Sequence, residues 1–376
     1  VLGSRTVLQA GSLALDRRQS ATSSTLRSLN LRSALVSLNL PMRCCLSVKR
    51  PDYGNSADSI WRTECSSAHI RGNIIQISGC RDVQTSADVG NVQQAFGIHS
   101  NAYIGHAGGA CTSALFSYLK WYPETPLIDC LNGIRESLAW KGFTQVPQLS
   151  CSHEINLASP VKLFCPTLSG RAVLIGINYV GMEGELFGCH NDALLVEEYL
   201  RTHGMSDSTS IWALMDDGKH TPPSYMNILR AFAWLTDGAK PGDTLFLHYS
   251  GHGAYSIDYN CDELDGKDET LVPLDYMYSG QIVDDVIHKS LISKVPTGVT
   301  LQVLTDCCHS GTALDLPHKF VGHEHNIRRA RELIIQQNGT APINHNDFAQ
   351  KLAKHMPIVP LPSKAYLKHQ KLKVFH

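Results

Sequence analysis

The sequence predicts an α/β fold: a three-layer sandwich in which helices flank a mostly parallel central sheet of about six strands. Two observations support this fold class. Between residues 171 and 305, apolar runs typical of buried strands alternate with helical segments, and strands that alternate with helices pair in parallel with both sheet faces covered. An earlier block, residues 73–151, has the patterns of two strands and two helices, too few to form a domain alone.

The later block contains the more regular alternation. Short apolar runs indicate buried strands, and longer segments with helical periodicity indicate helices. Gly204 is a stop signal for the first of these helices. The expected strands are 171–179, 210–215, 243–249 and 299–305, and the expected helices are 191–203, 224–235 and 283–294.

The earlier block begins with an apolar run at 73–78 that ends at Gly79, which predicts a buried strand. Helices are expected at 110–121 and 126–140, and a second strand at 145–151. The second helix has one apolar face, formed by Leu127, Leu131, Ile134 and Leu138. After residue 319 the chain is basic and lacks clear periodicity apart from one expected helix at 326–337.

Composition is typical of a soluble globular protein, with 43% apolar and 18% charged residues. The formal net charge of −1 favours neither a nucleic-acid partner nor an anionic membrane surface. No apolar run approaches the roughly 20 residues of a membrane-spanning helix. The 12 cysteines include no paired CxxC sets, which argues against structural zinc and favours reduced thiols in a cytosolic or organellar compartment.

Residues 1–48 differ from the rest of the chain. They carry six arginines against a single acid, Asp16, and are dense in serine and threonine. This composition is typical of an organelle transit peptide, and a disordered leader is the alternative. A cytoplasmic location is therefore expected, or an organelle if this segment is a transit peptide.

Two expected strands end in unusual residues: Ser250-Gly251-His252-Gly253 follows one, and Asp306-Cys307-Cys308-His309-Ser310-Gly311 follows the other. The carboxyl ends of parallel strands meet at one edge of the sheet, so neighbouring strands would bring His252 and Cys308 together. A nearby imidazole can take the proton of a thiol, which is nucleophilic only as thiolate. The N–H groups of Gly253 and Cys308 are candidates to hold an oxyanion, and a backbone carbonyl could orient the His252 ring.

These residues resemble the paired catalytic motifs of metacaspases. The match continues through residues 171–179 (RAVLIGINY), 188–193 (GCHNDA) and 282–285 (IVDD), so it covers the large-subunit region, about 169–318. The resemblance implies a caspase-like fold and cysteine peptidase activity. It also identifies Cys308, just before His309, as the nucleophile in preference to Cys307. The QACxG sequence of true caspases is absent, so specificity for aspartate is not implied.

A second resemblance concerns the order of the regions. Residues 77–89, 108–115 and 141–152 resemble the metacaspase small-subunit region, which normally follows the large one and here precedes it, as in type III metacaspases of algae. The implied organisation is an N-terminal extension (1–72), a small-subunit region with linker (73–168), a catalytic large-subunit region (169–318) and a tail (319–376).

The family resemblance also implies an acidic pocket for the residue before the scissile bond. The matching positions are Asp192, Ser250 and Asp306, with Cys189 nearby. Carboxylates in a partly dry pocket suit a guanidinium or ammonium group, so cleavage after arginine or lysine is expected. The alternative for Asp192 is a helix N-terminal acid that interacts with the helix dipole.

Acidic residues are crowded between positions 262 and 269 and again at positions 284 and 285. Crowded carboxylates favour a hard cation, although a solvated acidic loop or a helix cap would explain them equally well. The resemblance to calcium-dependent metacaspases implies calcium as cofactor, and the matching ligand positions are Asp268, Asp284, Asp285 and Asp315.

The combined expectation is a calcium-dependent cysteine endopeptidase that cleaves after arginine or lysine through an acyl-enzyme. Its partners would be protein or peptide substrates with basic residues, with no nucleic acid and no membrane, and the chain would be a monomer. Two alternatives stay open: a catalytically silent scaffold of the caspase fold, and a calcium-independent, arginine-specific peptidase resembling paracaspases.

Overall fold

A computed structural model of the protein describes residues 60–63, 70–80, 84, 86–98, 107–161, 163, 170–205, 207, 209–257, 267–308, 313–320, 322 and 324–338. The chain divides into two compact units, Val1–Arg50 and Pro51–His376, and every described residue belongs to the second. The predicted transit segment, 1–48, and most of the predicted tail lie outside the described residues.

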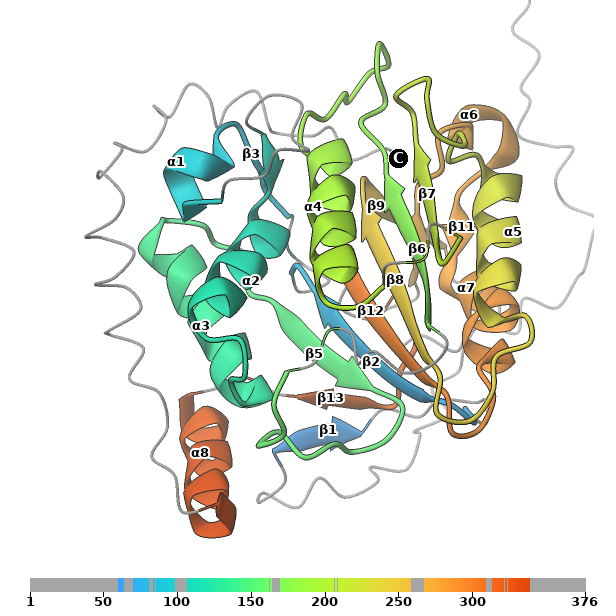
Figure 1. Ribbon diagram of the computed structural model, residues 1–376. Coiled ribbons are helices and arrows are strands. Elements are labelled where there is room, and N and C mark those ends of the chain that lie inside the picture. Colours follow the sequence, from blue (N-terminus) through green and yellow to red (C-terminus); the bar gives the residue numbers. More distant parts are fainter. Residues whose placement is uncertain are drawn as a thin grey trace, which may run out of the picture. The chain divides into compact units, whose positions relative to one another are not determined.

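The central sheet has eight strands in the order β1-β13-β5-β2-β12-β8-β6-β7 (Figure 1). Strands β2, β12, β8, β6 and β7 pair in parallel, whereas β5, β13 and β1 pair antiparallel at one edge. The predicted α/β fold with a mostly parallel sheet is therefore confirmed, although the sheet has eight strands where about six were expected. The bounds are β1 Trp61–Thr63, β2 Asn73–Ser78, β5 Gln148–Cys151, β6 Gly170–Gly176, β7 Ile211–Met215, β8 Thr244–Ser250, β12 Thr300–Asp306 and β13 His318–Phe320.

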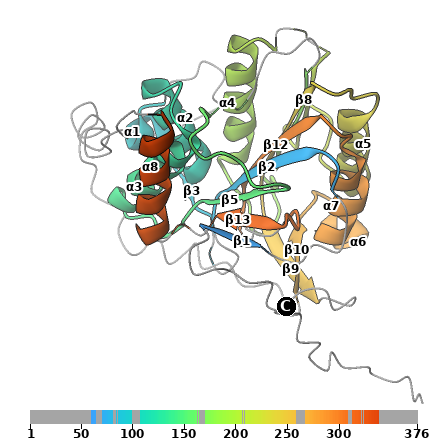
Figure 2. The ribbon, with the colours of Figure 1, turned by 90° about the horizontal axis from the view of Figure 1, so that it is seen from below.

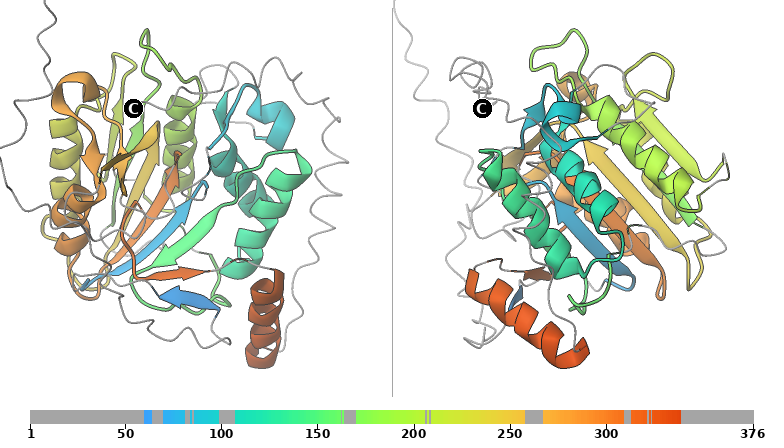
Figure 3. Two further views of the ribbon diagram at one scale, coloured as in Figure 1. Left: turned by 180° about the vertical axis from the view of Figure 1, so that it is seen from behind. Right: turned by 60° about the vertical axis from the view of Figure 1, so that its left-hand side comes forward.

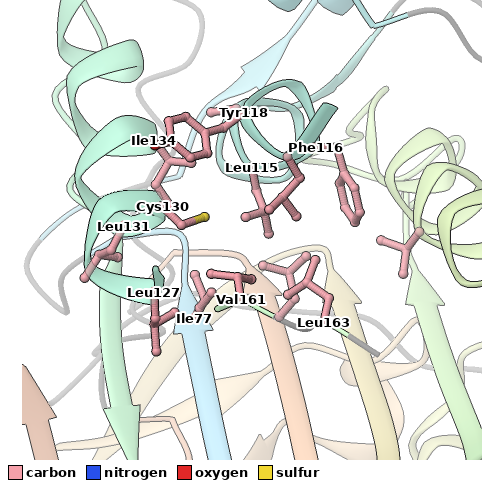
Figure 4. Close-up of a cluster of buried hydrophobic side chains, with 14 of the residues drawn as sticks. Ile77, Leu115, Phe116, Tyr118, Leu127, Cys130, Leu131, Ile134, Val161 and Leu163 are labelled. Atoms are coloured by element: carbon pink, nitrogen blue, oxygen red, sulfur yellow. The ribbon is translucent and has the colours of Figure 1, made fainter. Parts of the chain in front are cut away.

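Helices cover both faces of this sheet (Figures 2 and 3). Alternate side chains of each strand face opposite layers: in β6, Leu174 packs with one cluster, and Val173 and Ile175 pack with the other. The first cluster includes residues of α2 Ala110–Trp121, α3 Leu127–Trp140 and α4 Cys189–Thr202, and the second includes residues of α5 Tyr225–Thr236 and α7 Asp284–Ser290. In Figure 4, side chains of α2 and α3, such as Leu115 and Leu127, point toward the sheet.

The block at 73–151 joins the same sheet as the later block. Strand β2 pairs with β12, from Thr300 opposite Asn73 to Thr305 opposite Ser78. Strand β5 then pairs with β2. The earlier block therefore completes the sheet on one side of β12, which is why its own strands and helices were too few for a separate domain.

Several short elements escape the sequence patterns. They are β3 Asp88–Val89, α1 Val92–Phe96, β4 Gly108–Gly109, β9 Gly253–Ile257, β10 Lys267–Leu271, α6 Tyr276–Ser279 and β11 Ile282–Val283. Strand β1 also lies before residue 70, where ordered structure was expected to begin. The expected helix 283–294 is α7 followed by a 3₁₀ turn, Ile292–Lys294, and the expected helix near 326–337 is α8 Glu324–Asn338.

Among the described helices, none is both long enough and apolar enough to cross a membrane.

Candidate active site

The two motif-bearing strands, β8 and β12, are neighbours, and Asp306 pairs with Ser250 at their carboxyl ends. The backbone of Gly253 then meets the backbone of Cys308. A side-chain carbon built on Gly253 would lie 1.9 Å from the carbonyl oxygen of Cys308, so no other residue fits there. The backbone of Cys308 occupies the space beside this glycine.

The His252 ring is held by a backbone carbonyl. Its Nε2 atom lies 2.6 Å from the carbonyl oxygen of Gly184, in the loop between β6 and α4. Because a carbonyl only accepts hydrogen bonds, Nε2 carries the proton of the neutral ring and Nδ1 keeps a lone pair. Burial lowers the pKa of His252 below its ordinary value, and the Gly184 carbonyl opposes this effect. The ring is thus neutral at neutral pH and can act as a base.

A carboxylate from the next strand holds the loop that carries Gly184. After β7, Asp216 accepts hydrogen bonds from the N–H groups of Asn178 (2.9 Å) and Val180 (3.1 Å). His190 Nε2 lies 2.5 Å from the same carboxylate. Burial alone would raise the pKa of Asp216, but the hydrogen bonds from His190 and the two N–H groups lower it overall. The carboxylate therefore stays charged and keeps the loop in place at neutral pH.

Cys308 is buried, with 8% of its surface exposed. Burial raises the pKa of its thiol to about 11; the charge of Asp306 adds to this rise, and the Ser86 N–H group opposes it. The sulfur is therefore a neutral thiol at neutral pH. Within the described part of the chain, no hydrogen bond joins His252 to Cys308, although their loops are in contact through Gly253.

Two buried carboxylates lie beside the nucleophile. Asp192, at the start of α4, accepts hydrogen bonds from the Gly109 N–H at 2.8 and 2.9 Å and from the Ser250 hydroxyl at 2.7 Å. Asp306 accepts one from the Thr112 N–H at 2.8 Å and one from the Ser86 hydroxyl. Of the four expected pocket positions, Asp192 and Ser250 are therefore hydrogen-bonded to each other, and Asp306 is the β12 residue paired with Ser250.

The two carboxylates also interact electrostatically. Burial raises the pKa of Asp192 well above its usual value, and the charge of Asp306 raises it further. Burial raises the pKa of Asp306 as well. A carbon added to Gly109 would lie 2.3 Å from an oxygen of Asp306 and 2.6 Å from one of Asp192. Since no ion pair of the described residues includes either carboxylate, the pair suits a cationic side chain.

Cys189, the fourth expected pocket position, is buried at the first position of α4. Its N–H donates to the side-chain oxygen of Asn178 at 3.0 Å. Burial raises the pKa of its thiol well above the usual value, and the nearby charges of Asp88 and Asp192 add to this rise. The Cys189 thiol is therefore neutral at neutral pH and lacks the character of a second nucleophile.

The sequence reasoning missed a third carboxylate, Asp88. Its Oδ2 accepts a hydrogen bond from the Phe187 N–H at 2.8 Å. Burial raises its pKa, and the charge of Asp306 contributes in the same direction. Ser86 and Gly109 were missed as well, although residues 77–89 and 108–115 had been noted as family-like segments. Nothing in the spacing of these residues indicates which side chains would face β12.

The expected calcium ligands are only partly brought together. Antiparallel pairing of Thr270 with Val283 and of Leu271 with Ile282 places Asp284 opposite Glu269, whose N–H it accepts at 2.9 Å. Asp268 is the next residue along β10, and Asp285 the next along α7. The donors are all carboxylates, which suits a hard cation. Within the described ranges, however, no group of three or more His, Cys, Asp or Glu residues is arranged to hold a metal, and Asp315 does not complete one.

Comparison with known proteins identifies relatives. Residues 170–317 match the family profile described as the metacaspase, peptidase C14 domain. A Phaeodactylum tricornutum protein named Metacaspase III c is 48% identical over 261 residues, covering 67% of this chain and 76% of that protein. Metacaspase-1 of Mycosarcoma maydis is 47% identical over 152 residues, 40% of this chain and 38% of that protein. A crystal structure of a Geobacter sulfurreducens protein shares 27% identity and a TM-score of 0.32, covering 47% of this chain and 67% of that one.

Proposed function

Because the chain belongs to the metacaspase family of cysteine-type endopeptidases, we propose that it is a calcium-dependent member that cleaves proteins after arginine or lysine. One observation carries the proposed specificity: two buried carboxylates, Asp192 and Asp306, lie side by side next to the nucleophile loop, and neither forms an ion pair with a described residue. A substrate guanidinium or ammonium group would neutralise both.

The proposed chemistry uses Cys308 and His252. Nδ1 of His252 takes the thiol proton as the sulfur attacks the scissile carbonyl carbon, and the N–H groups of Gly253 and Cys308 hold the oxyanion. The same imidazole then returns its proton to the leaving amine, which leaves an acyl-enzyme on Cys308. Water, activated by the neutral imidazole, hydrolyses this thioester and restores the thiol. The carbonyl of Gly184 keeps the ring in the tautomer that these steps need.

A direct test compares two fluorogenic peptides, one with arginine and one with aspartate before the scissile bond, each with and without calcium. The proposal expects cleavage of the arginine peptide alone, and only with calcium. Cleavage that persists with a chelator would favour the paracaspase-like alternative. Absence of turnover in every condition would favour the silent scaffold.

Asp88 is assigned to the same specificity pocket, because its charge acts on Asp192, Cys189 and Asp306. Asp88→Asn is expected to lower kcat/KM for an arginine peptide about fivefold, since a partly exposed charge contributes about 1 kcal/mol. Steady-state kinetics would measure this, with Asp207→Asn, in an exposed turn, as the control. Unchanged kcat/KM in Asp88→Asn would remove this residue from the pocket.

Calcium dependence is tested best at Asp285, which is exposed, because the buried Asp284 also accepts hydrogen bonds from the Glu269 and Asp285 N–H groups. Asp285→Asn is expected to raise the calcium concentration for half-maximal cleavage about tenfold, a loss of roughly 1.4 kcal/mol in binding. Calorimetric titration of calcium should show the same weakening without substrate. Equal calcium affinity in the two proteins would exclude Asp285 as a ligand.

A further inference from the structure

Two buried tyrosines surround the backbone of His252. The Tyr179 hydroxyl donates to the carbonyl of Val272 at 2.6 Å and accepts the N–H of His252 at 3.0 Å. The Tyr249 hydroxyl lies 2.7 Å from the carbonyl of His252, to which it donates, and accepts the N–H of Val272 at 3.2 Å. Both polar groups of the His252 backbone are therefore bound by phenol hydroxyls, and the same hydroxyls bind the residue that follows β10.

The surrounding residues accommodate these hydroxyls closely. A side-chain carbon on Gly251 would lie 3.0 Å from the Tyr249 oxygen and 3.2 Å from the Tyr179 oxygen. A side chain at position 251 would therefore crowd both hydroxyls. The Tyr179 ring also contacts the His252 imidazole, with centroids 4.6 Å apart and planes inclined by 31°.

Tyr179 adopts an unusual backbone conformation, with φ of 53°. A bulky residue with positive φ is uncommon and carries an energetic cost of about 1–3 kcal/mol. The surrounding contacts hold it there, and this conformation directs the ring onto His252. Burial raises the pKa of both phenols well above the usual value, so both hydroxyls keep the proton that each must donate.

We infer that Tyr179 and Tyr249 are positioning residues that hold His252 between the Gly184 carbonyl and the Cys308 loop. This inference rests on the proposed role of His252 as the base. Neither hydroxyl touches the substrate in this role. They set the place of the imidazole, and a displacement of about 1 Å can reduce a catalytic rate about 10²-fold.

The test removes each hydroxyl while keeping the ring. Tyr179→Phe and Tyr249→Phe are each expected to lower kcat for an arginine peptide about tenfold with KM unchanged, and the double variant about 100-fold. KM should stay unchanged because it reflects substrate binding near Asp192, which neither substitution alters. Tyr118→Phe, which removes a buried hydroxyl from α2, and Tyr278→Phe, on the exposed α6, are the controls and should keep full kcat.

A second measurement separates positioning from general destabilisation. Alkylation of Cys308 by iodoacetamide at pH 7, followed by mass spectrometry, should slow in both phenylalanine variants. In a His252→Ala background, the same substitutions should have no further effect, because the imidazole they position is gone. An equal further decrease in that background would overturn the inference, as would unchanged kcat in both single variants. If His252→Ala itself kept full activity, the proposed function would fail instead.

Discussion

Replacing Cys308 with alanine is expected to lower peptide cleavage by roughly 10⁴-fold or more, because removal of a nucleophile leaves only the catalysis supplied by binding and oxyanion contacts. Cys308 lies on the loop that contacts Gly253, and burial holds its thiol neutral with a pKa of about 11. The reaction therefore depends on proton transfer to His252. The measurement is kcat/KM with an arginine peptide, with calcium present throughout.

Cys307→Ala is the matched control for this prediction. Both thiols are buried and adjacent in sequence, so the two variants differ chiefly in which sulfur is lost. The Cys307 sulfur would lie 3.3 Å from a carbon added to Gly253, within the second hydrophobic cluster. Cys307→Ala should keep activity within about tenfold while losing some stability. The reverse pattern would transfer the role of nucleophile to Cys307.

Asp192→Asn is expected to lower kcat/KM for an arginine peptide roughly 10²-fold, because removing one charge of a buried ion pair costs about 2–5 kcal/mol. Asparagine has nearly the same shape, so its oxygen can still accept the Gly109 N–H and its amide can face Ser250. For a peptide with citrulline in place of arginine, the same substitution should lower kcat/KM much less, because citrulline is neutral. Asp237→Asn, at the end of α5, is the control.

Asp192→Asn is expected to stabilise the folded protein at pH 7 even though it lowers activity. Burial, together with the charge of Asp306, raises the pKa of Asp192 in the folded state. The folded state therefore binds this proton more tightly than the unfolded state, and the free energy of unfolding falls as pH rises through and above the usual aspartate range. Asp192→Asn should reduce this fall and raise the thermal midpoint at pH 7. A lower midpoint together with lost cleavage would indicate misfolding in place of lost specificity.

The sequence alone determined the fold class and most of the elements. Strand 73–78 and helix 110–121 were predicted at the bounds the structure has, because the repeat of apolar residues is a local property that follows directly from helix and strand geometry. The sequence also showed that each catalytic motif directly follows a strand. Once β8 and β12 pair, this position places His252 and Cys308 at the same edge of the sheet.

Only the tertiary structure decided which residues surround them. Asp88 in β3, Gly109 in β4, and Gly184 and Tyr179 in the segment between β6 and α4 lie far from both motifs along the chain, and no local pattern shows that they would surround His252 and Cys308. The Gly109 N–H reaches Asp192 across 83 positions of sequence, and the Tyr179 hydroxyl reaches Val272 across 93. Contacts over such separations depend on strand order and on how loops pack together, and periodicity carries no information about either.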